Sequence, residues 1–201
     1  MIFYYAPIES KTGDLYRIFY LHVSTAWISY FAFGVTMIGS ILYLLRREYL
    51  WDSIAVISAQ LGIIFCSTTL IIGSIWAGVA WGIHWNWDPR ETTTLILWIL
   101  YVSYLSFRMS IHDQEKRARI SAVLGILAFI SVPLSYFSVK LWFSIHTLVI
   151  QPGRIGLTTP MIHTLIVAMA AILLIYFVLL KLTLDVFNLE EEFLILKEKM
   201  R

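Results

Sequence analysis

The chain has 201 residues, of which 59% are hydrophobic and 14% are charged, and its net charge at pH 7 is +2. A soluble domain carries about 25% charged residues, so this composition excludes an ordinary soluble protein and indicates an all-α, polytopic membrane protein. The sequence contains no Gly-rich phosphate loop, which argues against a nucleotide-binding domain, and no feature that indicates a nucleic-acid partner.

The charged residues are clustered, and the segments between them are long enough to cross a membrane. A transmembrane helix needs about 20 predominantly apolar residues. The sequence therefore predicts five transmembrane helices, near residues 18–44, 53–77, 91–110, 119–139 and 160–185. The third charge-free run is the shortest, and we expect the side chain of Arg108 to snorkel to the interface and extend it.

Two connections and the C-terminal segment are expected outside the membrane. Residues 78–90 form a Trp-rich loop, and residues 140–159 form a second loop with a piece that lies on the surface. The apolar run at 141–153 is too short to span and contains Pro and Gly. Residues 186–201, which mix acidic and basic side chains, are expected to be a helical tail in the cytoplasm.

The distribution of Lys and Arg predicts the orientation. Ten of the 15 Lys and Arg residues lie on the side of the C-terminus. The positive-inside rule places that side in the cytoplasm, so the N-terminus and both loops face outward from the cell membrane. We expect no cleavable signal peptide, because the first residues lack a basic start followed by a short apolar core.

The single cysteine limits the redox chemistry of the chain. Cys66 lies inside the second predicted span, and the sequence has neither a Cys-x-x-Cys nor a Cys-x-x-Cys-His motif. Thiol redox catalysis is therefore not expected, and neither is covalent attachment of haem to this chain.

The segment Trp81-Gly82-Ile83-His84-Trp85-Asn86-Trp87-Asp88 is the most distinctive part of the sequence. Its three Trp side chains form an aromatic surface large enough to receive a flat apolar ligand such as haem. If the segment is helical, Trp81, Trp85 and Asp88 share one face. The simplest role for Asp88 is to cap the third helix, because Pro follows it and Glu stands three residues later.

Histidines supply the candidate ligands for haem iron. Four of the five are expected near the outer face, namely His22, His84, His146 and His163. The fifth, His112, is expected on the cytoplasmic side. Two opposed imidazoles hold a six-coordinate haem, whereas a histidine at an interface can also have no special function. Arg17, five residues before His22, is either an anchor at the interface or a partner for a haem propionate.

The motif Trp81-Gly82-x-x-Trp85-x-Trp87-Asp88 resembles the Trp-rich signature of the haem-handling membrane proteins of cytochrome c biogenesis. The flanking segments Tyr16-Arg17-Ile18-x-Tyr20-Leu21-His22-Val23 and Pro133-x-x-x-x-Ser138-Val139-x-x-Trp142-x-x-x-His146 are similar to the haem exporter protein C branch, CcmC. The resemblance covers about residues 13 to 150. The chain is too short for the synthase branches CcmF and CcsA.

The resemblance implies a delivery role without catalysis. A CcmC protein holds haem b non-covalently at the outer face and presents it to the haem chaperone CcmE. The matching axial ligands are His22 and His146. The resemblance implies that the Trp segment receives the porphyrin, through Trp81, Trp85, Trp87 and Asp88. It also implies that Arg17 and, less directly, Arg90 neutralise the propionates. The implied partners are CcmE, the small protein CcmD and the ATP-driven CcmA–CcmB pair.

The sequence also departs from the CcmC pattern. Many members have six spans, and this chain is expected to lack the first. Asp88-Pro89-Arg90-Glu91 is more similar to the synthase branch. His84 falls at a variable position of the motif, and His163 has no counterpart, so neither is expected to be a ligand.

Two other classes stay open from the sequence. A membrane b-type cytochrome usually places its histidines deep inside the spans, whereas these lie near one surface. A transporter of haem or another solute should have polar midplane residues or broken helices. The predicted spans contain Gln60 and several Ser, Thr and Gly residues but no charged midplane group, which gives this class little support.

Overall fold

The structure is a computed structural model that describes residues 1–9, 12–146, 150–151 and 154–200. These residues form the elements η1 Asp14–Tyr16, α1 Arg17–Arg46, α2 Tyr49–Trp81, α3 Pro89–Met109, α4 Gln114–Phe129, α5 Ser131–Leu141, β1 Ile150–Gln151, β2 Arg154–Ile155 and α6 Thr159–Lys199. The two short strands pair with each other in antiparallel fashion. The prediction of an all-α membrane protein is therefore confirmed, with a minimal hairpin added in the second loop.

Four helical segments of the described chain are long and apolar enough to cross a membrane. They are Asp14–Arg46, Tyr49–Trp81, Gln114–Leu141 and Thr159–Phe187. The third of these joins α4 to α5 through Ile130. The expected span at 91–110 forms α3, which has 21 residues but is less apolar than the other four. That α3 crosses the membrane stays a prediction.

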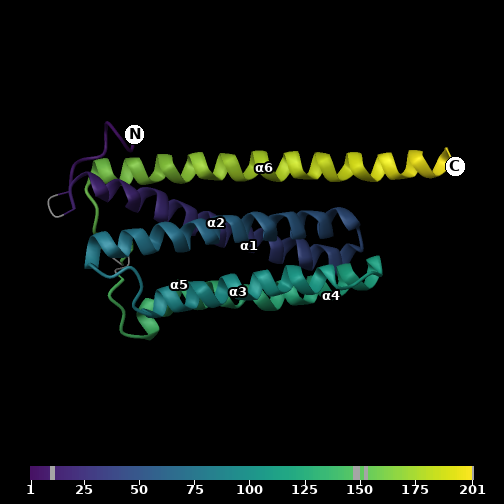
Figure 1. Ribbon diagram of the computed structural model, residues 1–201, viewed down its shortest axis with the longest axis horizontal. Coiled ribbons are helices and arrows are strands. Elements are labelled where there is room, and N and C mark those ends of the chain that lie inside the picture. Colours follow the sequence, from purple (N-terminus) through teal and green to yellow (C-terminus); the bar gives the residue numbers. More distant parts are fainter. Residues whose placement is uncertain (10–11, 147–149, 152–153, 201) are drawn as a thin grey trace.

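The helices pack in three groups, as Figure 1 shows. The antiparallel pair α1 and α2 lies in the middle, α6 packs along one side of this pair, and α3, α4 and α5 pack along the other. The helix α6 projects beyond every other helix at its C-terminal end. The expected tail at 186–201 therefore continues α6 as a helix up to Lys199.

Two left-handed residues end the central helices. Arg47, with φ 60°, follows α1, and Gly82, with φ 76°, follows α2. Each donates its N–H to a carbonyl in the last turn, which is the usual way to satisfy a helix C-terminus. Because α2 continues to Trp81 instead of ending near 77, only residues 82–88 of the Trp segment form a loop. The helical alternative for this segment is therefore wrong.

Arg108 does not snorkel to the interface as expected. Its guanidinium donates to both carboxylate oxygens of Asp52, at 2.8 and 2.6 Å, and both side chains are only 11% exposed. Asp52 lies in the first turn of α2 and Arg108 in the last turn of α3. This bidentate pair ties the two helices together at the end of the bundle opposite the Trp segment.

Candidate functional site

A cavity of about 300 Å³ lies at the end of the bundle that carries the Trp segment. This volume is at the lower end of the range for sites that bind small molecules and cofactors, about 300 to 1,000 Å³. Its walls come from α1, α2, α3, α5, α6 and both loops, and its polar lining includes His22, Thr69, Arg90, Glu91, Thr94 and His146. Much of the remaining lining is aromatic: Phe19, Trp27, Tyr30, Trp76, Trp81, Trp85 and Tyr136. Such a wall suits a flat apolar ligand.

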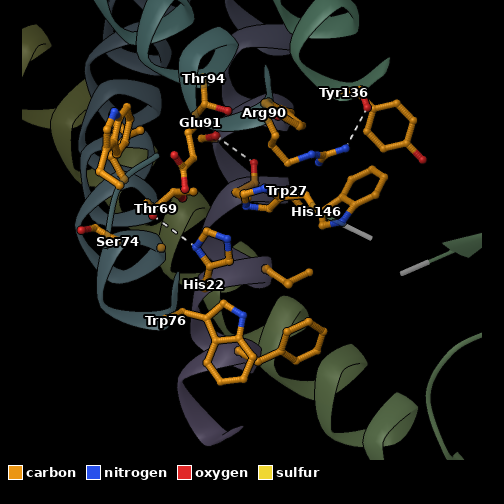
Figure 2. A pocket seen from close by; sticks show the side chains of 18 of the residues that line it. His22, Trp27, Thr69, Ser74, Trp76, Arg90, Glu91, Thr94, Tyr136 and His146 are labelled. Atoms are coloured by element: carbon orange, nitrogen blue, oxygen red, sulfur yellow. Dashed lines mark hydrogen bonds between the residues drawn. The ribbon is translucent and has the colours of Figure 1, made fainter. Parts of the chain in front are cut away.

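His22 enters the cavity from the second turn of α1. Its Nδ1 lies 3.2 Å from the carbonyl oxygen of Thr69 in α2. A carbonyl only accepts, so Nδ1 carries the proton and Nε2 keeps its lone pair. The ring has room because Gly73 faces it, and a Cβ at that position would come within 2.6 Å of the ring atom Cε1. Figure 2 shows this imidazole between Thr69 and Trp76.

His146 enters the same cavity from the loop that follows α5. Its Nδ1 lies 2.9 Å from Oδ1 of Asp88. Burial lowers the pKa of His146 below its ordinary value, although the neighbouring carboxylate of Asp88 acts in the opposite direction. The imidazole is therefore neutral near pH 7, with the proton on Nδ1 and a free lone pair on Nε2. Trp81 packs edge-on against this ring at 4.7 Å between centroids.

Asp88 connects the Trp segment to the loop that carries His146. As predicted, it caps α3 by accepting from the N–H of Arg90 at 2.9 Å. It also accepts from the hydroxyl of Ser144 and the N–H of Ile145, both at 2.8 Å. Burial raises the pKa of Asp88, but these hydrogen bonds outweigh that effect and hold its pKa below the ordinary value. The carboxylate is thus ionised and fixes residues 144–146 against α3.

Of the two arginines considered for propionates, Arg90 lines the cavity and Arg17 does not. Arg90 donates Nη2 to the carbonyl of Tyr136 at 2.9 Å, as Figure 2 shows, while its buried Nε has no acceptor in the part of the chain that the structure describes. That N–H is free for an anionic ligand. Arg17 instead pairs with Asp14 at 2.7 Å and lies over the ring of Phe3.

The tryptophans of the motif divide between the cavity and the surface. Trp81 and Trp85 line the cavity, whereas Trp87 is 67% exposed and is not part of the described lining. The rings of Trp85 and Trp87 meet edge to face at 5.7 Å. The motif therefore extends as one aromatic surface from the cavity to the outside of the molecule.

The remaining histidines lie outside the cavity. His84 bonds through Nδ1 to the carbonyl of Ser74 at 3.1 Å, and His163 bonds to the hydroxyl of Tyr5 at 3.1 Å. His112 is exposed in the connection between α3 and α4. Within the described ranges, no three His, Cys, Asp or Glu side chains gather as a metal-binding group.

Sequence reasoning missed several aromatic residues that line the cavity: Trp27, Tyr30, Trp76 and Tyr136. The spacing along the helices could have identified two of them. Tyr30 follows His22 by eight residues, which places both on one face of α1, and Trp76 follows Thr69 by seven residues on α2. The position of Tyr136 depends on the packing of α5, which no local pattern specifies.

Comparison with known proteins shows the family of the chain. The family described as "Heme exporter protein C" (CcmC) matches residues 1–197. The chain belongs to the heme exporter protein C family. The resemblance seen in the Trp segment is thereby confirmed over nearly the whole chain, and the apolar helices make this member a multi-pass membrane protein.

Similar proteins occur in bacteria and plants. The chain is 35% identical over 150 residues to Heme exporter protein C of Bradyrhizobium diazoefficiens, covering 75% of this chain and 56% of the relative. It is 34% identical over 158 residues to a putative cytochrome c biosynthesis ccmC-like mitochondrial protein of Marchantia polymorpha, covering 79% and 65%. For Heme exporter protein C of Escherichia coli K12 the identity is 28% over 144 residues, covering 72% and 59%. The matched regions thus span between 56% and 65% of these relatives.

Proposed function

We propose that this protein binds haem non-covalently at the outer face of the membrane, between His22 and His146, for cytochrome c maturation. One observation carries the proposal. Both imidazoles line one cavity, and each engages its Nδ1 with an acceptor of the protein, Thr69 or Asp88. Both Nε2 atoms are therefore available to a metal, and partners of this kind hold a ligating imidazole in its tautomer.

The rest of the cavity is consistent with haem as the cargo. Trp81 and Trp85 provide aromatic faces for a porphyrin, and the unsatisfied Nε of Arg90 provides a donor for a propionate. Arg17, held by Asp14, is better explained as an anchor at the interface. No general acid or nucleophile is required, so we propose binding and delivery instead of catalysis.

The outer part of the site suits transfer to another protein. We propose that the exposed Trp87, which adjoins Trp85, belongs to the surface that meets the haem chaperone CcmE. His146 stands on a loop that hydrogen bonds to Asp88 hold in place, so we propose that a partner releases this ligand by breaking those bonds, while His22 stays on its helix. By family membership, CcmD and the CcmA–CcmB pair are proposed as the other partners. The orientation predicted from Lys and Arg places this end outside the cell membrane.

The proposal is tested by absorption spectroscopy of the purified protein supplied with haem. We expect the wild type to show six-coordinate, low-spin haem, and His22→Ala and His146→Ala each to lose one axial ligand. Free imidazole in the buffer should restore the six-coordinate spectrum of both variants. His84→Ala is the matched control, because His84 lies near the same surface but outside the cavity. Unchanged spectra in both ligand variants would place the ligands elsewhere.

A further inference from the structure

A second, smaller hollow adjoins the cavity on the side where α1 faces α4 and α5. It measures about 240 Å³ and lies between the helices. Only aromatic and aliphatic residues line it: Trp27, Tyr30, Phe129, Val132, Pro133, Tyr136 and Phe137. Three of them, Trp27, Tyr30 and Tyr136, line the cavity as well. The two hollows therefore share a wall to which these three residues contribute.

The three residues that the two hollows share are all aromatic. The rings of Trp27 and Tyr136 meet edge to face at 5.5 Å between centroids. The short helix α5 packs mainly against α3, and the hydroxyl of Tyr30 bonds to that of Ser135 at 2.9 Å and ties α1 to α5. Rotation of the Trp27 or Tyr136 ring would open the wall without separating the helices, and rotamer changes of this kind are fast compared with helix motion.

The far side of the smaller hollow is open to the surroundings of the bundle. Pro133 is exposed, Phe137 is 44% exposed and Trp27 is 37% exposed. These residues lie on two helical segments that are long and apolar enough to span a membrane, so in a bilayer the opening would face lipid acyl chains. Its lining offers no charged side chain, which favours an apolar ligand over a hydrated one.

We propose that this hollow is a lateral port, through which a flat, apolar ligand passes from the bilayer into the cavity. That the ligand is haem rests on the proposed function. Arg90 stands at the inner lip of the port, with its guanidinium 6.0 Å from the ring centroid of Tyr136. An anionic edge of the incoming ligand meets this cation as the ring of Tyr136 turns aside, while the apolar edge stays among Trp27 and its neighbours.

The test measures the rate at which the protein takes up haem from lipid. The full chain is reconstituted in lipid nanodiscs and mixed with vesicles that contain haem, and the six-coordinate spectrum is followed in time. Pro133→Trp fills the mouth of the port without touching the cavity. The matched control is Leu134→Trp, which places the same ring on the next residue; Leu134 is 41% exposed and lines neither hollow.

We expect Pro133→Trp to slow uptake by about tenfold or more, as a blocked gate does, and Leu134→Trp to match the wild type. The final spectrum of Pro133→Trp, and its release of haem to apomyoglobin in water, should be unchanged. Uptake at the wild-type rate by Pro133→Trp would overturn the port, and so would equal slowing of uptake and release.

A widening variant keeps the proposal testable if Pro133→Trp does not fold. Phe137→Ala enlarges the mouth, so we expect faster uptake from lipid, and an unchanged rate would overturn the port. Failure of the proposed function and failure of the port give different results. If the wild type binds no haem from water or from lipid, the proposed function fails and the port falls with it. If the wild type binds haem and neither port variant alters uptake, only the port fails.

Discussion

Gly73→Ala gives a direct test of the position of His22. A Cβ on residue 73 would lie 2.6 Å from Cε1 and 3.0 Å from Nδ1 of the His22 ring, whereas ordinary contacts begin at 3.4 Å. The ring must therefore retreat by about 0.8 Å, the difference between 2.6 and 3.4 Å. Its hydrogen bond to Thr69 is already 3.2 Å long, so this movement breaks the bond. The proton of the imidazole is then no longer fixed on Nδ1.

The expected result of Gly73→Ala is haem binding weakened by about 10- to 100-fold, the range for loss of a supporting contact to a metal ligand. Folding should survive, because Ala favours a helix over Gly by about 1 kcal/mol. Haem titration followed by absorption measures the affinity, and circular dichroism verifies the fold. Gly78→Ala is the matched control, since its Cβ would crowd His84 on the same helix. Wild-type affinity in Gly73→Ala would refute the placement of His22 as a ligand.

Three further predictions concern single contacts. Asp88→Asn should weaken haem binding by about 10- to 100-fold in the same titration, because the amide supports His146 and its loop less well. Arg90→Ala should weaken binding of haem by about tenfold or more but leave binding of haem dimethyl ester unchanged, since the ester lacks the anionic propionates. Asp52→Ala should lower the free energy of unfolding by about 3 to 5 kcal/mol, because it leaves the buried charge of Arg108 without its ion-pair partner. Denaturant unfolding in detergent checks this, and a loss under about 1 kcal/mol would contradict it.

The helices could be predicted from the sequence because their signal is local. A charge-free run of span length determines a helix in lipid whatever its neighbours are. The ends were less predictable, since α2 continues past 77 until Gly82 adopts a left-handed conformation. The pairing of Arg108 with Asp52 was missed for a different reason. These residues are 56 positions apart, and no spacing rule connects them.

In the candidate site, too, some features could be predicted from the sequence and others depended on contacts between distant residues. The resemblance named His22, His146 and the Trp segment, and the structure brings both histidines together with Trp81 and Trp85 around one cavity, while Trp87 lies at the surface. For the propionates the sequence favoured Arg17, which precedes His22 by five residues, over Arg90. The structure separates them through their partners, Asp14 for Arg17 and the Tyr136 carbonyl for Arg90.

Asp88 explains why a helix-capping signal also marks the site. A cap uses one acceptor position of a side chain, and an ionised carboxylate offers about four. In this chain the N–H of Arg90 occupies one position, and the others serve Ser144, Ile145 and His146. The start of α3 therefore determines where His146 lies. Capping and positioning are two results of one ionised side chain, so a change that spares the cap but removes the charge should disturb the histidine first.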